Sequence, residues 1–329
     1  MISPPVLTPH CRAGQSRERE KDLDANTIQI SAVWISEALY ALATALLVLG
    51  FAFKRETWIR RSILAAAVGL LPHTLAIIVR WVQAGHAPYI QFYEVILSDT
   101  WFGVVMFLGL VWRYPRLRPA GLLALPLTFI LLGIGVLSST EIRSLPPTFQ
   151  TYWLILHILF AKLTYGSYLV AADLGLLYLL KARYLRRQGV LIKVNPHLRE
   201  VTPEGLTLDA ALGESFYRRL PGVARLDELS YRFSVAGFLF CGTMIAAGAV
   251  WANNAWGQYW SWDPVETWSL VTWLAYGVFL HLRLRRGWKG SRSAWYLLGA
   301  LVLALASFFL MPYIMTSIHS AYLGRSFLR

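Results

Sequence analysis

The chain has 329 residues, of which 56% are hydrophobic and 15% are charged. Soluble domains carry roughly 45–50% apolar and about 25% charged residues, and a soluble chain of this size cannot bury so large an apolar excess. The composition therefore excludes a soluble two-domain enzyme and indicates an integral membrane protein. The formal net charge of +13 is compatible with binding of nucleic acid, with anionic lipid, or with a fixed orientation in a membrane.

The chain begins with a polar segment and continues with apolar stretches. Residues 1–30 are mixed in charge and rich in proline, so we expect a disordered tail, followed by one membrane domain over residues 31–329. Eight apolar stretches, each near the ~20 residues of a bilayer crossing, lie at about 33–53, 62–82, 94–112, 119–138, 153–181, 229–252, 268–284 and 294–318. The predicted fold class is all-α, a polytopic integral membrane helical bundle of about eight transmembrane helices.

The connections between these stretches differ sharply in their basic residues. One set of alternate segments carries 21 Lys and Arg in total; these are 54–61, 113–118, 181–228 and 283–293. The other set carries only 3; these are 83–93, 139–152, 253–267 and the C-terminal 318–329. Because cytoplasmic loops are enriched in Lys and Arg, the rich set is predicted to face the cytoplasm or stroma. The long connection 182–228 is then a cytoplasmic-side loop. The positive net charge therefore reflects the orientation of the chain in the membrane, and no nucleic acid is expected as a partner.

Tryptophan is concentrated in one segment, since six of the 14 Trp lie between residues 251 and 273. An interfacial aromatic belt is one explanation, but a belt places scattered aromatics at both interfaces. The segment 251–268 is therefore predicted to be an outward-facing Trp-rich loop that offers an aromatic surface to a flat apolar ligand with polar edges. If it is helical, Trp256, Trp260 and Asp263 share one face.

The residues Asp263-Pro264-Val265-Glu266 also have the pattern of a helix start. Asp suits the N-cap, Pro the first helical position and Glu the third, as in a capping box. Capping is the favoured role of Asp263 and Glu266, and a polar contact from Asp263 to a ligand or partner is the alternative.

Two histidines lie on the predicted side of the Trp-rich segment. His157 begins the fifth stretch and His319 ends the eighth. Each is compatible with a polar anchor at the interface, but two neutral imidazoles beside an aromatic platform are also suitable axial ligands of a haem iron. The residues alone leave both roles open.

Other ionisable residues lie within the apolar stretches. His281 is 13 residues after Trp268, about 20 Å further along the seventh helix, and is either a functional group in the inner half of the bilayer or an interfacial residue. His73 is expected to serve helix packing, with an inner ligand role as the alternative, and His86 to be a polar loop residue. Pairing with Asp173 is one candidate explanation of Lys162.

The segment WANNAWGQYWSWDPVETWSLVTWLAYGVFLHLR strongly resembles the tryptophan-rich WWD signature of the cytochrome c biogenesis family CcsA, also called ResC. The resemblance extends to HTLAIIVRWVQAGHAPYIQFYEV (73–95), YWLILH (152–157) and IHSAY (318–322), and so covers most of the chain from about residue 40. CcmC and CcmF, which also handle haem, share the WG-x-x-W-x-WD core but differ in its flanks.

The resemblance implies a membrane subunit of a cytochrome c synthetase, or haem lyase, complex. Such a subunit moves haem b across the membrane and presents it for thioether attachment to the CxxCH motif of apocytochrome c. By position, His157 and His319 are implied as axial ligands of an outer haem. His281 is implied as a ligand at an inner site that shares haem with a CcsB/ResB partner. The residues implied to surround the outer haem are Trp256, Trp260, Trp262 and Asp263.

The resemblance also implies partners and a location. The partners are a CcsB/ResB-type membrane protein, apocytochrome c, membrane lipid and, as a further candidate, a thioredoxin-like thiol reductant. The location is the bacterial inner membrane, or the thylakoid membrane in a plastid, with the WWD segment on the periplasmic or lumenal side. Two alternatives stay open: a haem exporter or chaperone without ligase activity, and a non-haem membrane protein whose Trp cluster is an interfacial anchor.

Overall fold

The computed structural model describes residues 9–138, 140–142, 145–188, 216–315 and 317. Regular structure in these residues is helical, and they contain no strand. The main helices are α1 (Pro9–Ala52), α2 (Glu56–Ala84), α3 (Phe92–Arg113), α4 (Gly121–Val136), α5 (Tyr152–Arg187), α7 (Val223–Trp256), α8 (Pro264–Arg286) and α9 (Ser291–Leu305). Short 3-10 turns are η1 (Pro115–Ala120), η2 (Pro147–Phe149) and η3 (Phe216–Arg219), and α9 continues through the π-helical turn η4 (Ala306–Leu310) into α10 (Met311–Ile314).

Seven helical segments of the described chain are long and apolar enough to cross a membrane. The remaining predicted crossing, 268–284, corresponds to α8, whose 23 residues reach about 35 Å. Its Trp, Tyr, Ser and Thr residues lower its mean hydropathy, but it packs beside α7 and α9 as part of the bundle. The predicted all-α polytopic membrane fold of about eight helices is thus confirmed.

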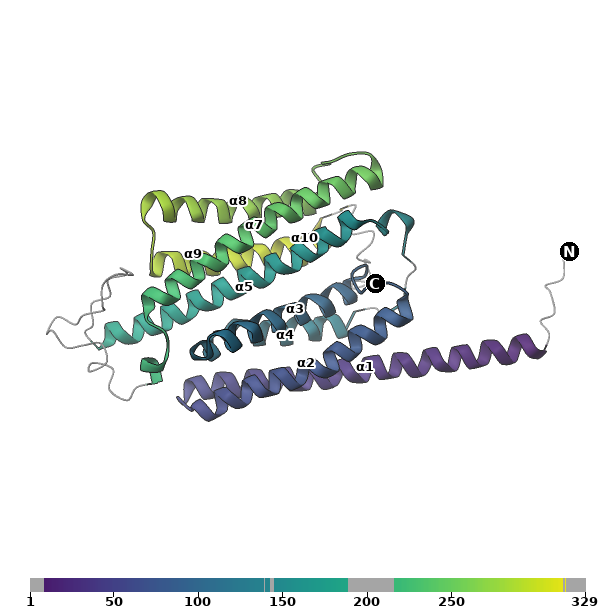
Figure 1. The fold of residues 1–329 in the computed structure, drawn as a ribbon, viewed down its shortest axis with the longest axis horizontal. Coiled ribbons are helices and arrows are strands. Elements are labelled where there is room, and N and C mark those ends of the chain that lie inside the picture. The colour runs from purple at the N-terminus through teal and green to yellow at the C-terminus, as the bar shows by residue number, and fades with distance from the viewer. Residues whose placement is uncertain (1–8, 139, 143–144, 189–215, 316, 318–329) are drawn as a thin grey trace.

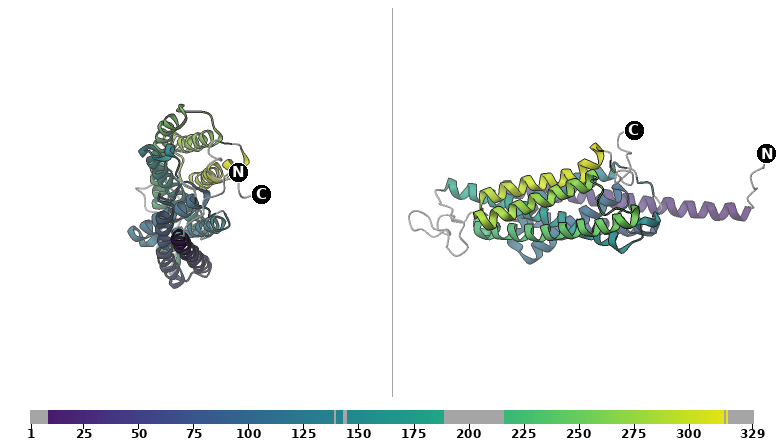
Figure 2. Two further views of the ribbon diagram at one scale, coloured as in Figure 1. Left: turned by 90° about the vertical axis from the view of Figure 1, so that its right-hand side faces the viewer. Right: turned by 90° about the horizontal axis from the view of Figure 1, so that it is seen from above.

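The helices lie side by side in one elongated bundle. α1 and α2 pair along one edge, α3 and α4 come next, α5 and α7 pack along their length, and α8 and α9 form the other edge (Figure 1). Viewed from the end, the cross-section is extended, with α1 and α8 far apart (Figure 2). The central position of α5 lets it contact α3, α4, α7 and α9.

The connections gather at two ends of the bundle. The basic connections around residues 53–55, 114–120 and 287–290 lie at one end, and the connections 85–91 and 257–263, together with residues 137–138 and 145–151, lie at the other (Figure 1). The separation of basic loops from the Trp-rich loop that the sequence predicts is therefore present in the fold. Of the loop predicted over 182–228, residues 182–187 belong to the end of α5 and residues 223–228 to the start of α7. Residues 189–215 lie outside the described part.

The N-terminal region differs from the prediction. The sequence indicates a disordered tail over 1–30, but α1 begins at Pro9 and so includes residues 9–30; residues 1–8 lie outside the described part. Residues 17–25 are mostly Arg, Glu, Lys, Leu and Ala, with opposite charges three positions apart. Such residues favour a helix, so the helix of the first crossing continues beyond its apolar stretch (Figure 1).

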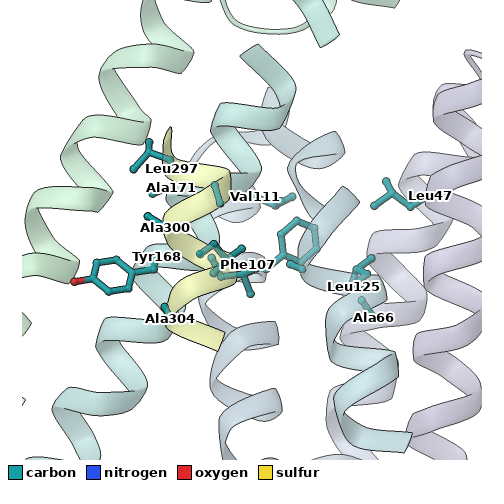
Figure 3. Packing of buried hydrophobic residues seen from close by; sticks show 14 of the residues in the cluster. Leu47, Ala66, Phe107, Val111, Leu125, Tyr168, Ala171, Leu297, Ala300 and Ala304 are labelled. Atoms are coloured by element: carbon teal, nitrogen blue, oxygen red, sulfur yellow. The ribbon is translucent and has the colours of Figure 1, made fainter. Parts of the chain in front are cut away.

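The core is built where α5 meets its neighbours. Tyr168 and Ala171 of α5 pack near Ala300 and Ala304 of α9, with Phe107 of α3 on the other side (Figure 3). The small side chains let the helices approach closely, which is how helices associate in a lipid environment.

Buried charges in the bundle have specific partners. The predicted pairing of Lys162 with Asp173 is wrong, because Lys162 forms its ion pair with Asp99 of α3. Asp173 instead accepts hydrogen bonds from the backbone N–H groups of Leu123 (2.7 Å) and Ala124 (3.1 Å) at the start of α4. Lys162 and Asp173 are 11 positions apart, which corresponds to about 16 Å of helix and is too far for an ion pair.

We expect the buried pair of Arg80 and Glu94 to be essential for stability. Their side chains are 0% and 1% exposed, with Nε and Oε1 2.8 Å apart. Arg80→Met leaves the carboxylate buried without its cation, so the free energy of unfolding should fall by roughly 3–5 kcal/mol. Thermal unfolding in detergent measures this loss.

The exposed pair of Arg60 and Glu56 is the matched control, and Arg60→Met should cost less than about 1 kcal/mol. A double variant, Arg80→Met with Glu94→Gln, should be more stable than Arg80→Met alone. Equal losses at Arg80 and Arg60 would contradict the assignment.

Candidate functional site

A cavity lies at the Trp-rich end of the bundle, between α5, α7, α8 and η4. Its empty volume, including the open solvent at its mouth, is about 670 Å³. The wall is largely aromatic and aliphatic, and we call it the aromatic cavity. It is lined by His157, Trp256 and Trp260 together with Trp251 and Tyr259. Three of the predicted site residues therefore border one space.

His157 has a defined orientation at this wall. It lies near the start of α5, is half-buried, and its Nδ1 is 2.8 Å from the carbonyl oxygen of Met244 on α7. Because a carbonyl oxygen only accepts hydrogen bonds, Nδ1 carries the proton, and Nε2 is the nitrogen with the lone pair in the neutral ring. A backbone carbonyl that fixes the tautomer in this way is characteristic of imidazoles that bind metals.

Gly248 of α7 makes room for this imidazole. A Cβ at Gly248 would lie 2.6 Å from Nδ1 of His157 and 2.9 Å from its Cε1. Only glycine therefore allows α7 to pass His157 at this distance. Gly248 is not among the site residues that the sequence predicts. A small residue in an apolar helix indicates close packing but does not identify the side chain that packs against it.

The Trp-rich segment 251–268 is not one continuous helix. Trp256 is the last residue of α7, and Gly257 (φ +79°) ends the helix in the left-handed conformation. Residues 257–263 form a non-helical connection, so Trp256, Trp260 and Asp263 do not share a helical face. The physical reason is that Gly257 stops one helix and Pro264 starts the next.

Trp251 contributes to the cavity more directly than Trp262. The Trp251 ring is 4% exposed, contacts the Trp256 ring edge-on at 4.9 Å between centroids and donates from Nε1 to the Thr148 carbonyl at 2.9 Å. Trp262 is 70% exposed and does not line the cavity. Its φ of +58° is strained for a non-glycine residue, and its ring lies 5.8 Å from that of Trp260.

The capping role of Asp263 and Glu266 is confirmed. The Asp263 carboxylate accepts a hydrogen bond from Val265 N–H at 2.9 Å. The Glu266 carboxylate accepts from the N–H groups of Asp263 (3.3 Å) and Ser261 (2.9 Å), and Glu266 also lines the cavity. Ser317 Oγ donates to Asp263 Oδ1 at 2.8 Å. Ser317 is thereby attached to the start of α8, a contact that the sequence does not predict.

The remaining histidines occupy other places. His281 is exposed on the outer face of α8 and does not line the aromatic cavity. His73 is fully buried, with Nδ1 3.1 Å from Tyr40 Oη and Nε2 2.9 Å from the Leu97 carbonyl, so both ring nitrogens have partners within the bundle. His86 lies in the 85–91 connection, with Nδ1 2.9 Å from the Ala87 carbonyl. His319 lies outside the described residues, and the described part contains no cluster of three or more metal-binding side chains.

Comparison with known proteins identifies relatives over most of the chain. Residues 32–319 match the family model of the cytochrome C assembly protein. The CcsA protein of Gloeobacter violaceus is 32% identical over 309 residues, 83% of this chain and 90% of the relative. The CcsA protein of Synechococcus sp. strain CC9311 is 34% identical over 270 residues, 78% of this chain and 87% of the relative.

A solved structure shares the fold. The structure named cytochrome c haem lyase CcmF superposes with a TM-score of 0.59 at 16% identity, covering 93% of this chain and 47% of that chain. The family model and the sequence relatives agree, and this chain belongs to the CcsA family of cytochrome c biogenesis membrane proteins.

Proposed function

We propose that this chain is the membrane subunit of a cytochrome c synthetase complex that moves haem b across the membrane and presents it for thioether attachment to the CxxCH motif of apocytochrome c. The observation that carries the proposal is His157 at the wall of the aromatic cavity, with its tautomer set by the Met244 carbonyl. Haem is the substrate here. Its iron binds imidazole nitrogen, and its flat apolar ring suits a cavity lined by Trp256 and Trp260.

His319 is proposed as the second axial ligand. It follows Ser317 by two residues, and two residues span at most about 7 Å. The hydrogen bond from Ser317 to Asp263 holds Ser317 beside the Trp-rich connection. Asp263 thus acts as a positioning residue, and the exposed Trp262 is suited to contact the haem edge or the apocytochrome at the cavity mouth.

The chemistry required of this chain is positioning. In the attachment reaction each thiol adds across one vinyl group, so that one C–S and one C–H bond form and no electron acceptor is needed. The residues of the cavity hold the ring and leave its edge accessible to the thiols. The thiols must be reduced before they react, and a thioredoxin-like partner is proposed to supply that state.

His281 is proposed to serve an inner haem site completed by a CcsB/ResB partner. On α8 it lies in line with Val271, Leu274 and Val278, all exposed at the spacing of one helical face. An ionisable group on an apolar surface in a membrane is costly without a partner. A ligand from a neighbouring chain on this face would complete the site.

The basic end of the bundle is proposed to face the cytoplasm or stroma, because it carries most of the loop Lys and Arg. The aromatic cavity then opens on the periplasmic or lumenal side. The membrane would be the bacterial inner membrane or the thylakoid membrane.

The His157→Ala variant should lose haem. Because the ring supplies an iron ligand of the outer haem and not of the His281 site, we expect the Soret absorbance of protein purified with its partner to fall to about the half that belongs to the inner haem. His73→Ala is the matched control: it removes a buried helix-packing imidazole and should retain the spectrum. Loss of haem only in His73→Ala would contradict the proposal.

The Gly248→Ala variant should weaken haem binding without removing a ligand. The added Cβ displaces the His157 ring, and errors in ligand orientation typically cost about 10–100-fold in affinity. Gly299→Ala, where a Cβ meets nothing within 4 Å, is the control. Haem titration followed by absorbance measures both, and equal affinities in the two variants would contradict the role of Gly248.

The synthetase and exporter roles differ in one product. With this chain and its partner present, we expect covalent, thioether-linked cytochrome c to accumulate, and its level to fall at least about tenfold in His157→Ala. Haem-stained denaturing gels measure it. Unchanged covalent cytochrome with an altered haem distribution would favour the exporter.

A further inference from the structure

A second cavity lies beside the aromatic cavity, between α3, α4, α5 and the end of α9. Its empty volume, including open solvent at its mouth, is about 480 Å³, and we call it the ion-pair cavity. Most of its wall is aliphatic or aromatic. Its polar side chains are Asp99, Thr100, Thr128, Lys162 and Tyr165.

Lys162 is held within the bundle by two partners. Its Nζ is 2.8 Å from Ser98 Oγ and bonds to Asp99 Oδ1. The side chains of Lys162 and Asp99 are only 8% and 14% exposed. Lys162 is ten residues from the start of α5, about 15 Å along the helix. A charge pair at this depth is costly, and such pairs commonly mark a substrate pathway.

An aromatic partition separates the two cavities. Tyr165 lines both of them, and its ring lies 4.8 Å from that of Phe308. Phe308 lines the aromatic cavity, and its neighbour Phe309 lines the ion-pair cavity. These two phenylalanines belong to the π-helical turn η4, a conformation frequent at functional sites. Aromatic side chains therefore border both cavities, and Tyr165 is the lining residue that the two share.

Lys162 is the only cation among the described residues that line either cavity. It is five residues after His157 on α5, about 7.5 Å along the helix axis. Haem bears two carboxylate groups at one edge of its ring, and its two vinyl groups lie elsewhere on the ring. A carboxylate within the bundle needs a cation or a proton.

We propose that Lys162 binds a propionate carboxylate of the haem, and that the ion-pair cavity receives this edge when Tyr165 and Phe308 move apart. The proposal rests on the proposed function and deepens it. It assigns the orientation of the ring: the carboxylate edge points into the bundle and the vinyl groups point toward the mouth, where thiols arrive.

The exchange of partners conserves charge. A propionic acid group that enters as the neutral acid transfers its proton to the Asp99 carboxylate. The resulting propionate then pairs with the Lys162 ammonium, which keeps its own protons, while Asp99 becomes neutral. The site holds one cation and one anion before and after, so no additional charge is buried.

The test compares haemin with its dimethyl ester, which lacks free carboxylates, in absorbance titrations of the purified protein with its partner. The wild type should bind haemin at least about tenfold more tightly than the ester, the size of a single charge-assisted contact. Lys162→Met should abolish this preference and leave the ester affinity within about twofold of wild type.

Two further variants and one control distinguish loss of the Lys162 cation from loss of folding. Lys162→Met combined with Asp99→Asn removes both charges and so avoids an unpaired buried carboxylate; it should also lose the preference. Asp99→Asn alone keeps the cation and should retain the preference. Lys289→Met, at an exposed residue away from both cavities, is the control for loss of a positive charge.

The outcomes separate this proposal from the proposed function. Equal binding of haemin and its ester by the wild type, with a His157-dependent spectrum, would overturn the role of Lys162 only. A preference that persists in the double variant would also overturn it. Binding of neither compound by the wild type would overturn the proposed function itself.

Discussion

The close approach of α5 and α7 is the constraint on which the candidate site depends. Two glycines of α7 permit it: Gly237 accommodates the Tyr168 ring and Gly248 accommodates the His157 ring. The hydrogen bond from His157 to the Met244 carbonyl forms only at this separation. The same contact extends to α8, because Tyr168 stacks on Tyr276 with the ring planes 4° apart. The position of the imidazole, the width of the cavity and the placement of α8 therefore have one origin in helix packing.

Polar groups within the bundle fall into two kinds. Some complete the fold: Asp173 caps α4, and Arg283 pairs with Asp227 at 2.8 Å while Asp227 also accepts from Gly290 N–H. These groups are buried among protein atoms and have their partners. The pair of Lys162 and Asp99 differs because it borders a cavity. In a low-dielectric interior a charge beside empty space can exchange partners with a ligand, whereas a charge enclosed by protein cannot.

Helix α8 links the two places where haem is proposed to bind. Its first turn is held by the capping box of Asp263 and Glu266, beside the aromatic cavity. Its second half presents His281 on the outer face of the bundle. The two proposed haem sites require different surroundings. The aromatic cavity is enclosed by this chain, whereas the His281 site needs a surface that a second chain can reach. A single straight helix at the edge of the bundle provides both.

Local signals in the sequence determined much of this protein. Apolar stretches of sufficient length determined the crossings, the uneven Lys and Arg of the loops determined which connections lie together, and Asp263-Pro264-Val265-Glu266 determined where α8 begins, because each depends on residues near one another in the chain. Only the tertiary structure decided that Lys162 pairs with Asp99, that Gly248 faces His157, and that Trp251 rather than Trp262 lines the cavity. Those contacts join different helices, and their existence depends on the rotation and separation of packed helices, which hydrophobic pattern alone does not specify.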